Sequence, residues 1–367
     1  MIPINAPQIG QEEVEAVIQV LKSGILTHSL GAGPMVKRFE ADFAKFVGAK
    51  HAVAVNSGTA ALHMALAAVG VKRGDEVILP SFTFVATAET VVMAGAKPVF
   101  ADINPETYNI SPDEVEKAIT KRAKAVIAVD LYGAPADLKS IREITDKHGL
   151  KVIEDAAQAH GAVYDGKPVG AYADIACWSF YASKNMTTGE GGMITTNDDE
   201  LAEKLRLIRC HGEQQKYLSV MVGHNYRMPE IEAAIGYVQL QKLPRFLAKR
   251  RENAERLTAK LCKTDKLQLP KELKDCRNSW YLYTVRLIGA DRKRRDNIVE
   301  QLRGKGIGAE VYYPWPIHTM PYYCRFGKRK LPETEKAAEQ VFSLPVHPGV
   351  SAEQIDLIGE NVLKLLK

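Results

Sequence analysis

A single lysine, Lys184, carries the strongest chemical signal in the sequence. It follows an apolar, hydroxyl-containing run, Ser179-Phe-Tyr-Ala-Ser183, and a glycine-rich stretch, Gly189-Glu-Gly-Gly192, comes soon after it. A lone lysine is far more often a solvated surface residue, but this lead-in is unlike a solvated face. A lysine amine in such a setting can form an imine with a carbonyl compound. Lys184 is therefore the candidate catalytic residue.

A carboxylate, Asp155, closes a second apolar run, Lys151-Val-Ile-Glu-Asp155, and is followed by Gln158. A carboxylate at the end of a strand can keep a pyridine nitrogen protonated, because the ion pair raises the pKa of that nitrogen. A protonated ring withdraws electrons from a carbanion that forms beside it. The alternative is an aspartate that caps a following helix, which is about as common when the residue is viewed alone.

Two further groups lie where strands are expected to end. The turn Asn56-Ser57-Gly58-Thr59 leads into an alanine-rich helix, whose first N–H groups could bind a phosphate, although an ordinary helix cap is the more frequent meaning. Phe82 and Phe84 could stack on a flat ring or could fill core. An amine, an acid, a phosphate-binding turn and an aromatic ring together suit pyridoxal 5'-phosphate (PLP), which has an aldehyde, a ring nitrogen and a phosphate.

The elements that would position these groups alternate along the first three-fifths of the chain. Apolar runs predict strands at 51–55, 75–79, 98–102, 125–130, 151–155, 175–180 and 192–196. Helical segments lie between them, notably at 59–69 and 84–95. Continuous apolar strands that alternate with helices predict a mostly parallel sheet covered on both faces. Such sheets bind ligands beyond the carboxyl ends of their strands.

The pattern changes beyond residue 244. Helical patterns cover 230–242 and, from Pro244, the stretch into the 260s, and another helix is predicted at 297–305. Residues 280–286 alternate like a half-exposed antiparallel strand, and residues 309–313 are also strand-like. We therefore expect an α/β protein with a large domain over residues 1–244 and a smaller α+β domain over residues 245–367.

The composition argues against several other classes of protein. The net charge of +5 is modest and the basic clusters read as solvated faces, so nothing favours a nucleic-acid partner. No stretch approaches the roughly 18 apolar residues of a membrane span. The five cysteines are scattered without a CxxC pair, so we expect neither a disulfide framework nor a metal site. They suit a reducing cytoplasm.

The motifs together resemble the DegT/DnrJ/EryC1/StrS family of sugar aminotransferases. The resemblance extends over nearly the whole chain and is carried by Ser57-Gly58-Thr59, Glu154–Gly161, Ser179–Lys184, Gly189–Gly192 and Asn225–Met228. It implies a fold-type I, aspartate-aminotransferase-like architecture and a homodimer with active sites at the subunit interface. The N-terminal segment would pack on the small domain or on the partner. The stretch 26–34, which lies near the sugar in family members, is longer here.

By matching position, the resemblance gives each site residue a role. Lys184 forms the Schiff base with PLP, and Asp155 faces the pyridine nitrogen. Gln158 binds the phenolic oxygen, and Phe84 stacks on the ring. The residues implied for the phosphate are Gly58, Thr59 and Ser179, with Ser57 in the same turn and Asn225 supplied by the neighbouring subunit.

The resemblance also implies the reaction. An amino acid, glutamate in the family, would give its amino group to a nucleotide-diphosphate-linked keto-sugar by way of pyridoxamine 5'-phosphate. Family members that are dehydratases have histidine in place of Lys184, so dehydration is disfavoured. A non-catalytic PLP-binding regulator is disfavoured because Lys184, Asp155 and Gln158 are all present. A nicotinamide-dependent oxidoreductase would need a GxGxxG turn after its first strand, which this sequence lacks.

The candidate substrate residues are Arg227, Tyr313 and His318. Arg227 could meet a substrate phosphate or pair within the protein, and the residues leave both alternatives open. The segment Tyr312-Tyr-Pro-Trp-Pro-Ile-His318 resembles one found in members that act at the sugar C3 position. It could equally be a strand end with core tyrosines and a surface histidine.

Overall fold

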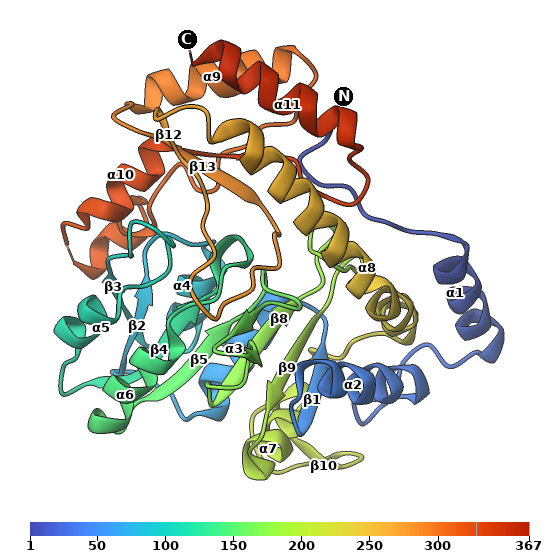
Figure 1. The fold of residues 1–367 in the computed structure, drawn as a ribbon. Coiled ribbons are helices and arrows are strands. Elements are labelled where there is room, and N and C mark those ends of the chain that lie inside the picture. Colours follow the sequence, from blue (N-terminus) through green and yellow to red (C-terminus); the bar gives the residue numbers. More distant parts are fainter. Residues whose placement is uncertain (328, 367) are drawn as a thin grey trace.

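The centre of the computed structural model, which describes residues 1–327 and 329–366, is a seven-stranded sheet (Figure 1). Only β9 runs antiparallel to its neighbours, so the predicted mostly parallel sheet is confirmed. All seven predicted strands are present, with ends shifted by two residues at most. In spatial order they are β1 (His51–Val55), β9 (Gly192–Thr196), β8 (Ile175–Ser179), β5 (Lys151–Asp155), β4 (Ala123–Val129), β2 (Glu76–Pro80) and β3 (Lys97–Ala101).

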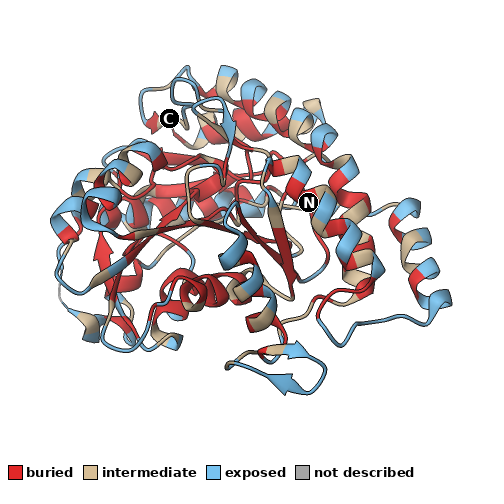
Figure 2. Cartoon of the chain, turned by 90° about the horizontal axis from the view of Figure 1, so that it is seen from below, coloured by how far each residue is buried: buried red, intermediate tan, exposed pale blue. Residues whose placement is uncertain are grey.

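Helices cover both faces of this sheet, because its strands are apolar on both sides. One face packs against α3 (Gly58–Ala68), α4 (Ala86–Met93) and α7 (Asp199–Arg209). The other packs against α2 (Pro34–Val47), α5 (Pro112–Ala118) and α6 (Leu138–His148). Figure 2 shows the strands as a buried layer between helices that are exposed on their outer sides.

A single long helix, α8 (Glu230–Leu261), replaces the two helices predicted on either side of residue 243. Pro244 lacks the N–H that an unbroken helix needs, yet the helix continues through it. Leu243 and Phe246, which flank this proline, are both buried, so tertiary packing outweighs the lost hydrogen bond. The predicted domain boundary at residue 244 falls inside this helix and stays a prediction.

The part of the chain beyond α8 forms a separate apolar cluster over a three-stranded antiparallel sheet. The N-terminal residues join it, because Ile2 pairs with Ile307 and is buried in the same cluster. The first residues of the chain thus pack on this unit. Its elements are β12 (Leu267–Gln268), β13 (Tyr283–Leu287), α9 (Arg292–Gly304), α10 (Pro332–Gln340), β14 (Val341–Leu344) and α11 (Ala352–Leu365).

Two predictions for this unit are wrong in part. β13 is buried along its whole length rather than half-exposed, because its polar side chains bond beneath α10, as when Arg286 donates to Gln340 at 2.7 Å. Residues 309–313 form no strand: Glu310 alone pairs with Ser343, and the chain then turns toward Gln158, which donates to the Tyr313 hydroxyl at 3.3 Å. Tertiary contacts decide both cases.

The remaining elements are short or peripheral. α1 (Gln11–Ser23) projects from the body beside α8 in Figure 1. Two small hairpins join β6 (Val163–Tyr164) to β7 (Lys167–Pro168) and β10 (Glu213–Gln215) to β11 (Leu218–Ser219). Three 3₁₀ turns, η1 (Leu131–Gly133), η2 (Ile317–Thr319) and η3 (Tyr323–Phe326), complete the described elements.

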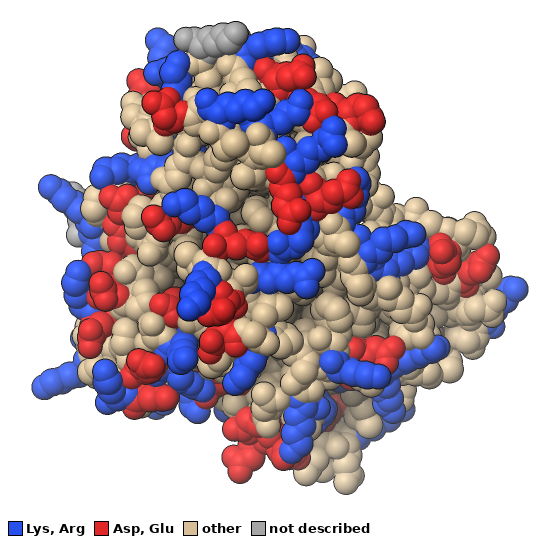
Figure 3. Space-filling model, viewed as in Figure 1, with Lys and Arg blue, Asp and Glu red and all other residues tan. Residues whose placement is uncertain are grey.

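The distribution of charge can be followed on one face of the molecule (Figure 3). On the face drawn in Figure 3, basic and acidic side chains are interspersed rather than gathered by sign. Within the described residues, none of the helices is long and apolar enough to cross a membrane. All five cysteines are free, two of them buried.

Candidate active site

Four parallel strands end at one edge of the sheet and bring most of the predicted residues together. β1, β2, β5 and β8 run in the same direction, so their carboxyl ends share this edge. The turn after β1 packs tightly against the end of β8 at Gly58, where an added Cβ would lie only 2.8 Å from the Cβ of Ser179. Gly192 lies as close to the Ser57 backbone, at 2.5 Å from the carbonyl oxygen to an added Cβ. A side chain at either glycine would displace the turn.

The turn at Ser57 is both a helix cap and a potential phosphate site. The Ser57 Oγ accepts the Ala60 N–H at 3.0 Å, which makes Ser57 the N-cap of α3. The N–H groups of Gly58 and Thr59 have no partner inside the helix, and the helix dipole adds partial positive charge there. The helix-cap alternative is therefore confirmed without excluding an anion at the same turn.

Asp155 is buried at the end of β5 and is held in place by two hydrogen bonds. Its Oδ2 accepts from the Thr87 hydroxyl at 2.9 Å, and its Oδ1 accepts from the Ala157 N–H at 3.3 Å. Burial raises the pKa of Asp155, while the Thr87 bond, the Lys184 charge and the Ala157 bond act to lower it. Residues 156–162 form turns rather than a helix, so the helix-cap alternative for Asp155 is wrong.

Lys184 lies half-buried in the loop between β8 and β9. The loop is braced from within, since the Lys184 N–H donates to the Tyr181 carbonyl at 2.9 Å and Thr188 donates to Phe180 at 3.0 Å. The Nζ lies 4.8 Å from the centroid of the Tyr281 ring. Its charge is near enough to lower the pKa of Asp155. The Lys184 amine and the Asp155 carboxylate thus belong to the same site.

Gln158 and the predicted aromatic ring form one group with Tyr313. The Gln158 Oε1 accepts the Tyr132 N–H at 2.7 Å, and its Nε2 donates to the Tyr313 hydroxyl at 3.3 Å. The Phe84 and Tyr313 rings lie 6.1 Å apart. Phe84 is 54% exposed and Phe82 only 1%, so Phe82 fills core while Phe84 offers a free ring face. Burial raises the pKa of Tyr313 well above its usual value.

Three other predicted residues have contacts outside this group, and their roles stay predictions. They are Arg227, Asn225 and His318. Arg227 donates to the Cys210 Sγ at 3.1 Å, which is the internal pairing that the sequence left open. Asn225 is exposed, next to the strand end of β1, where its neighbour Tyr226 accepts the Asn56 N–H at 3.0 Å.

His318 is not a surface histidine, as one of the two alternatives held. It is buried, with its Nδ1 2.7 Å from the Ser81 Oγ and its Nε2 3.4 Å from Glu335. Burial lowers the pKa of His318, with Glu335 opposing. Ser81 directly follows β2, so the ring still lies at the site's edge of the sheet.

Sequence reasoning missed three residues that contact the predicted ones. Thr87 bonds to Asp155, Ser183 lies 2.9 Å from the Tyr281 hydroxyl, and Tyr281 faces Lys184. Thr87 stands in the helix expected at 84–95 and Ser183 in the run before Lys184, and a hydroxyl next to a predicted site residue is a usable signal. Tyr281 lies 97 positions after Lys184 in a strand-like run, where nothing in the sequence marked it.

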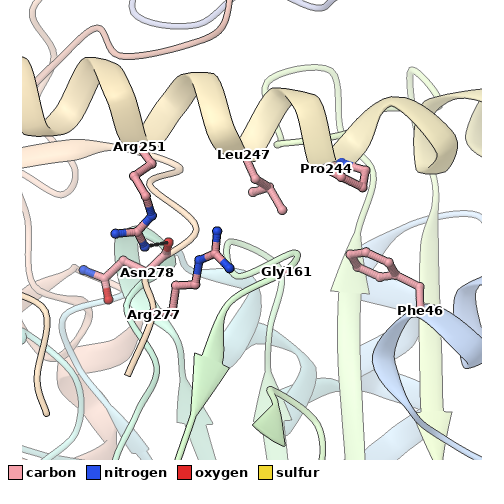
Figure 4. A pocket seen from close by; sticks show the side chains of 7 residues that line it. All are labelled: Phe46, Gly161, Pro244, Leu247, Arg251, Arg277 and Asn278. Carbon is pink, nitrogen blue, oxygen red and sulfur yellow. Dashed lines mark hydrogen bonds between the residues drawn. The ribbon is translucent and has the colours of Figure 1, made fainter. Parts of the chain in front are cut away.

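The structure also has a pocket that contains none of the predicted site residues. It lies between α8, the end of α2 and neighbouring loops, where Leu247 and Pro244 of α8 face Phe46 of α2 (Figure 4). Its two arginines are Arg251, which donates to the Asn278 carbonyl at 3.4 Å, and Arg277. No cluster of three or more metal-ligating side chains occurs in the described part of the chain.

The comparison with known families decides the class of protein. The model of the DegT/DnrJ/EryC1/StrS aminotransferase family matches residues 7–363. The chain belongs to this family. It is therefore an enzyme of the transaminase class, and the resemblance seen in the motifs is confirmed. Its seven-stranded, mostly parallel sheet with a smaller antiparallel unit is the fold-type I architecture.

Individual relatives are similar to this chain over nearly their whole length. A "pleiotropic regulatory protein" of Geobacillus stearothermophilus is 43% identical over 356 residues, which covers 96% of this chain and 94% of the relative. A GDP-perosamine synthase of Caulobacter vibrioides is 39% identical and covers 97% and 96%. The structure of Spr1654 from Streptococcus pneumoniae in its PLP-form superimposes with a TM-score of 0.94 at 28% identity, covering 100% of both chains.

Proposed function

We propose that this enzyme uses PLP to move an amino group from an amino acid, with glutamate as the expected donor, to a nucleotide-diphosphate-linked keto-sugar. The observation that carries the proposal is the placement of Lys184 and Asp155 at one sheet edge, beside the N-terminus of α3. A relative named GDP-perosamine synthase and one structure in PLP-form support the sugar and the cofactor. Amino-sugar synthesis is the corresponding role.

The residues at this edge fit the chemical groups of PLP. The turn at Ser57, Gly58 and Thr59, together with Ser179, would hold the phosphate, because Gly58 leaves room that a Cβ would fill. Asp155 is a buried carboxylate whose ionised form needs a cation, and a protonated ring nitrogen supplies one. Gln158 would bind the phenolic oxygen.

The protein's own residues would perform the proton transfers. When bound, the cofactor withdraws electrons from the substrate carbon that loses its proton. With the cofactor bound, the Lys184 amine would accept the proton from the Cα of the donor and would later release it as an acid. Asp155 would hold a protonated ring nitrogen by its negative charge, and Phe84 would pack against the face of the ring. A positioned acid–base group contributes about 10²–10⁴ in rate.

The test begins with the covalent site. Borohydride reduction of the protein mixed with PLP should label Lys184 in peptide maps. Adding glutamate should convert the bound cofactor to pyridoxamine phosphate, and a panel of keto-sugar nucleotides should convert it back. Lys184→Ala should bind the cofactor without turning over. Lys204→Ala, which removes a lysine bonded to the Ala68 carbonyl away from the site, is the matched control. A label elsewhere would refute the proposal.

A second candidate function is a PLP-binding regulator, which the name of the Geobacillus relative favours. The contacts around Asp155 and Lys184 argue for catalysis, because a passive binder needs no proton carrier beside its cofactor. The two candidates differ in the glutamate step: an enzyme exchanges its cofactor to the amine form, and a passive binder leaves the spectrum unchanged. Dehydration is disfavoured by the lysine at position 184.

We further propose that two copies pair and share their active sites. α1 turns polar residues toward α8, where Glu13 bonds to Lys242 at 2.7 Å, and leaves apolar residues such as Val14 and Leu21 exposed. The hairpin that leads to Asn225 carries Tyr217 and Val222, each 85% exposed. Exposed apolar surface of this kind marks an interface.

Subunit mixing tests the shared site directly. Asn225→Ala and Lys184→Ala proteins should each be inactive. Mixed and re-equilibrated, they should recover about a quarter of the normal activity, because half of the dimers are hybrids with one intact site of two. No recovery, with hybrids confirmed by mass, would show that Asn225 serves the site of its own subunit.

A further inference from the structure

The segment 279–281 holds the Lys184 loop at three points. The Ser183 Oγ lies 2.9 Å from the Tyr281 hydroxyl, and the Asn185 Nδ2 donates to the Ser279 carbonyl at 3.1 Å. Between them, the Nζ of Lys184 lies 4.8 Å from the centroid of the Tyr281 ring. Lys184 and both of its chain neighbours thus contact one short segment, which comes from the part of the chain beyond α8.

This segment is fixed from behind. Arg250, fully buried on α8, donates to the carbonyls of Trp280 and Tyr281, each at 3.1 Å. The Ser279 Oγ donates to the Gln158 carbonyl at 3.0 Å. Trp280 has a φ of 52°, a left-handed conformation that a bulky residue rarely adopts and that persists only where the surroundings impose it. The direction of Tyr281 is therefore set by its backbone.

The face of an aromatic ring attracts a cation within about 6 Å of its centroid. Lys184 gains positive charge when it accepts a proton, and its Nζ lies inside this range. We propose that Tyr281 is a positioning residue for the amino-transfer reaction: its ring stabilises positive charge on the Lys184 Nζ. The inference rests on the proposed function of Lys184.

The first test measures charge without turnover. The protein is loaded with PLP in the absence of donor, and its visible absorbance is titrated with pH. Tyr281→Leu removes the ring and should lower the pH midpoint by about 0.4–1.5 units, because the protonated linkage at Nζ loses the ring's attraction. Tyr281→Phe keeps the ring and should stay near the unsubstituted protein. Should the leucine variant not fold, Tyr281→Met offers similar volume without a ring.

The second test follows the proton transfer. Tyr281→Leu should lower kcat by about 2- to 30-fold and leave the KM for the donor unchanged, because the proposed effect of the ring is on the charge of the Lys184 Nζ. Deuterium at the donor Cα should slow this variant more than it slows the unsubstituted protein. Tyr281→Phe should restore both values. A merely structural residue would change stability and cofactor content without this pattern.

Tyr283→Leu is the matched control. Tyr283 is buried on β13 and its hydroxyl lies 2.7 Å from the Thr258 Oγ1, so its loss should reduce thermal stability without moving the pH midpoint. A midpoint and a kcat of Tyr281→Leu equal to those of Tyr283→Leu would overturn the inference while Lys184 remains labelled by borohydride. Failure to label Lys184 in the unsubstituted protein would instead refute the proposed function.

Discussion

Replacing Thr87 with valine should move the acid limb of the enzyme's pH profile to higher pH. Thr87 lies on α4 with its hydroxyl 2.9 Å from the Asp155 Oδ2, and both side chains are buried. A hydrogen bond to a charged group is worth about 1.5–3 kcal/mol. This corresponds to a change of about 1–2 units in the pKa of Asp155.

The direction of this shift follows from the need for Asp155 to be ionised. Burial raises the pKa of this carboxyl, and the Thr87 bond is the largest of the contacts that lower it. Only the ionised form holds a protonated ring nitrogen, so cofactor binding and activity are lost as the pH falls through this pKa. Valine has the shape of threonine without the hydroxyl. The pKa should therefore rise, and activity should fail at a pH about 1–2 units higher.

The assay is the pH dependence of kcat/KM for the donor half-reaction, measured with the affinity for PLP at each pH. Thr87→Ser keeps a hydroxyl and should keep most of the normal profile. Thr90→Val is the matched control, since the Thr90 hydroxyl donates to the Ala86 carbonyl at 3.0 Å in the same helix. Superimposable profiles for Thr87→Val and Thr90→Val would show that Thr87 does not support the charge of Asp155.

Three further predictions concern packing, charge and thiols. Gly58→Ala should weaken PLP binding at least about tenfold by pressing on Ser179, whereas Gly304→Ala, with open space around it, should bind normally; equilibrium titration compares them. Asp174→Asn should reduce the free energy of unfolding by about 1–3 kcal/mol in denaturant. Burial acts to raise the pKa of Asp174, but contacts with Val152, Arg142 and Lys151 lower it below the ordinary 3.8. The stabilisation by the Asp174 charge is therefore present above that pH and is lost as the pH falls below it. Thiol reagents should label the native protein first at the exposed cysteines, Cys262 and Cys324.

The sheet could be predicted because its information is local. Each strand is a short apolar run closed by polar or small residues, as at 51–55 and 151–155, and both ranges are as predicted. The unit beyond α8 is harder to predict from the sequence, because its strands depend on partners that are distant along the chain. β13 becomes fully buried only when α10 covers it, and residues 309–313 leave the sheet to reach Gln158.

The candidate site divides in the same way. Lys184, Asp155 and the turn at Ser57 stand at the ends of predicted strands, so the topology alone places them at one edge. Tyr281 lies beside Lys184 because α8 and the backbone of Trp280 hold its segment there. No local pattern encodes that placement. His318 shows the same limit, because its burial depends on Ser81 from a different part of the chain.

The two adjacent acids of β5 show how one carboxylate can serve the cofactor alone. Side chains alternate along a strand, so Glu154 projects from the face opposite to Asp155. Burial raises the pKa of Glu154, and nearby Asp130 raises it further. A proton held between the Glu154 and Asp130 carboxyl groups would leave one negative charge on this buried pair rather than two. Burial acts on Asp155 too, but Thr87, Lys184 and the Ala157 N–H oppose it. The pKa of Asp155 remains raised, but of these two acids it is the one whose ionised form has supporting contacts, and it lies on the side of Lys184, where a protonated ring would require a negative charge.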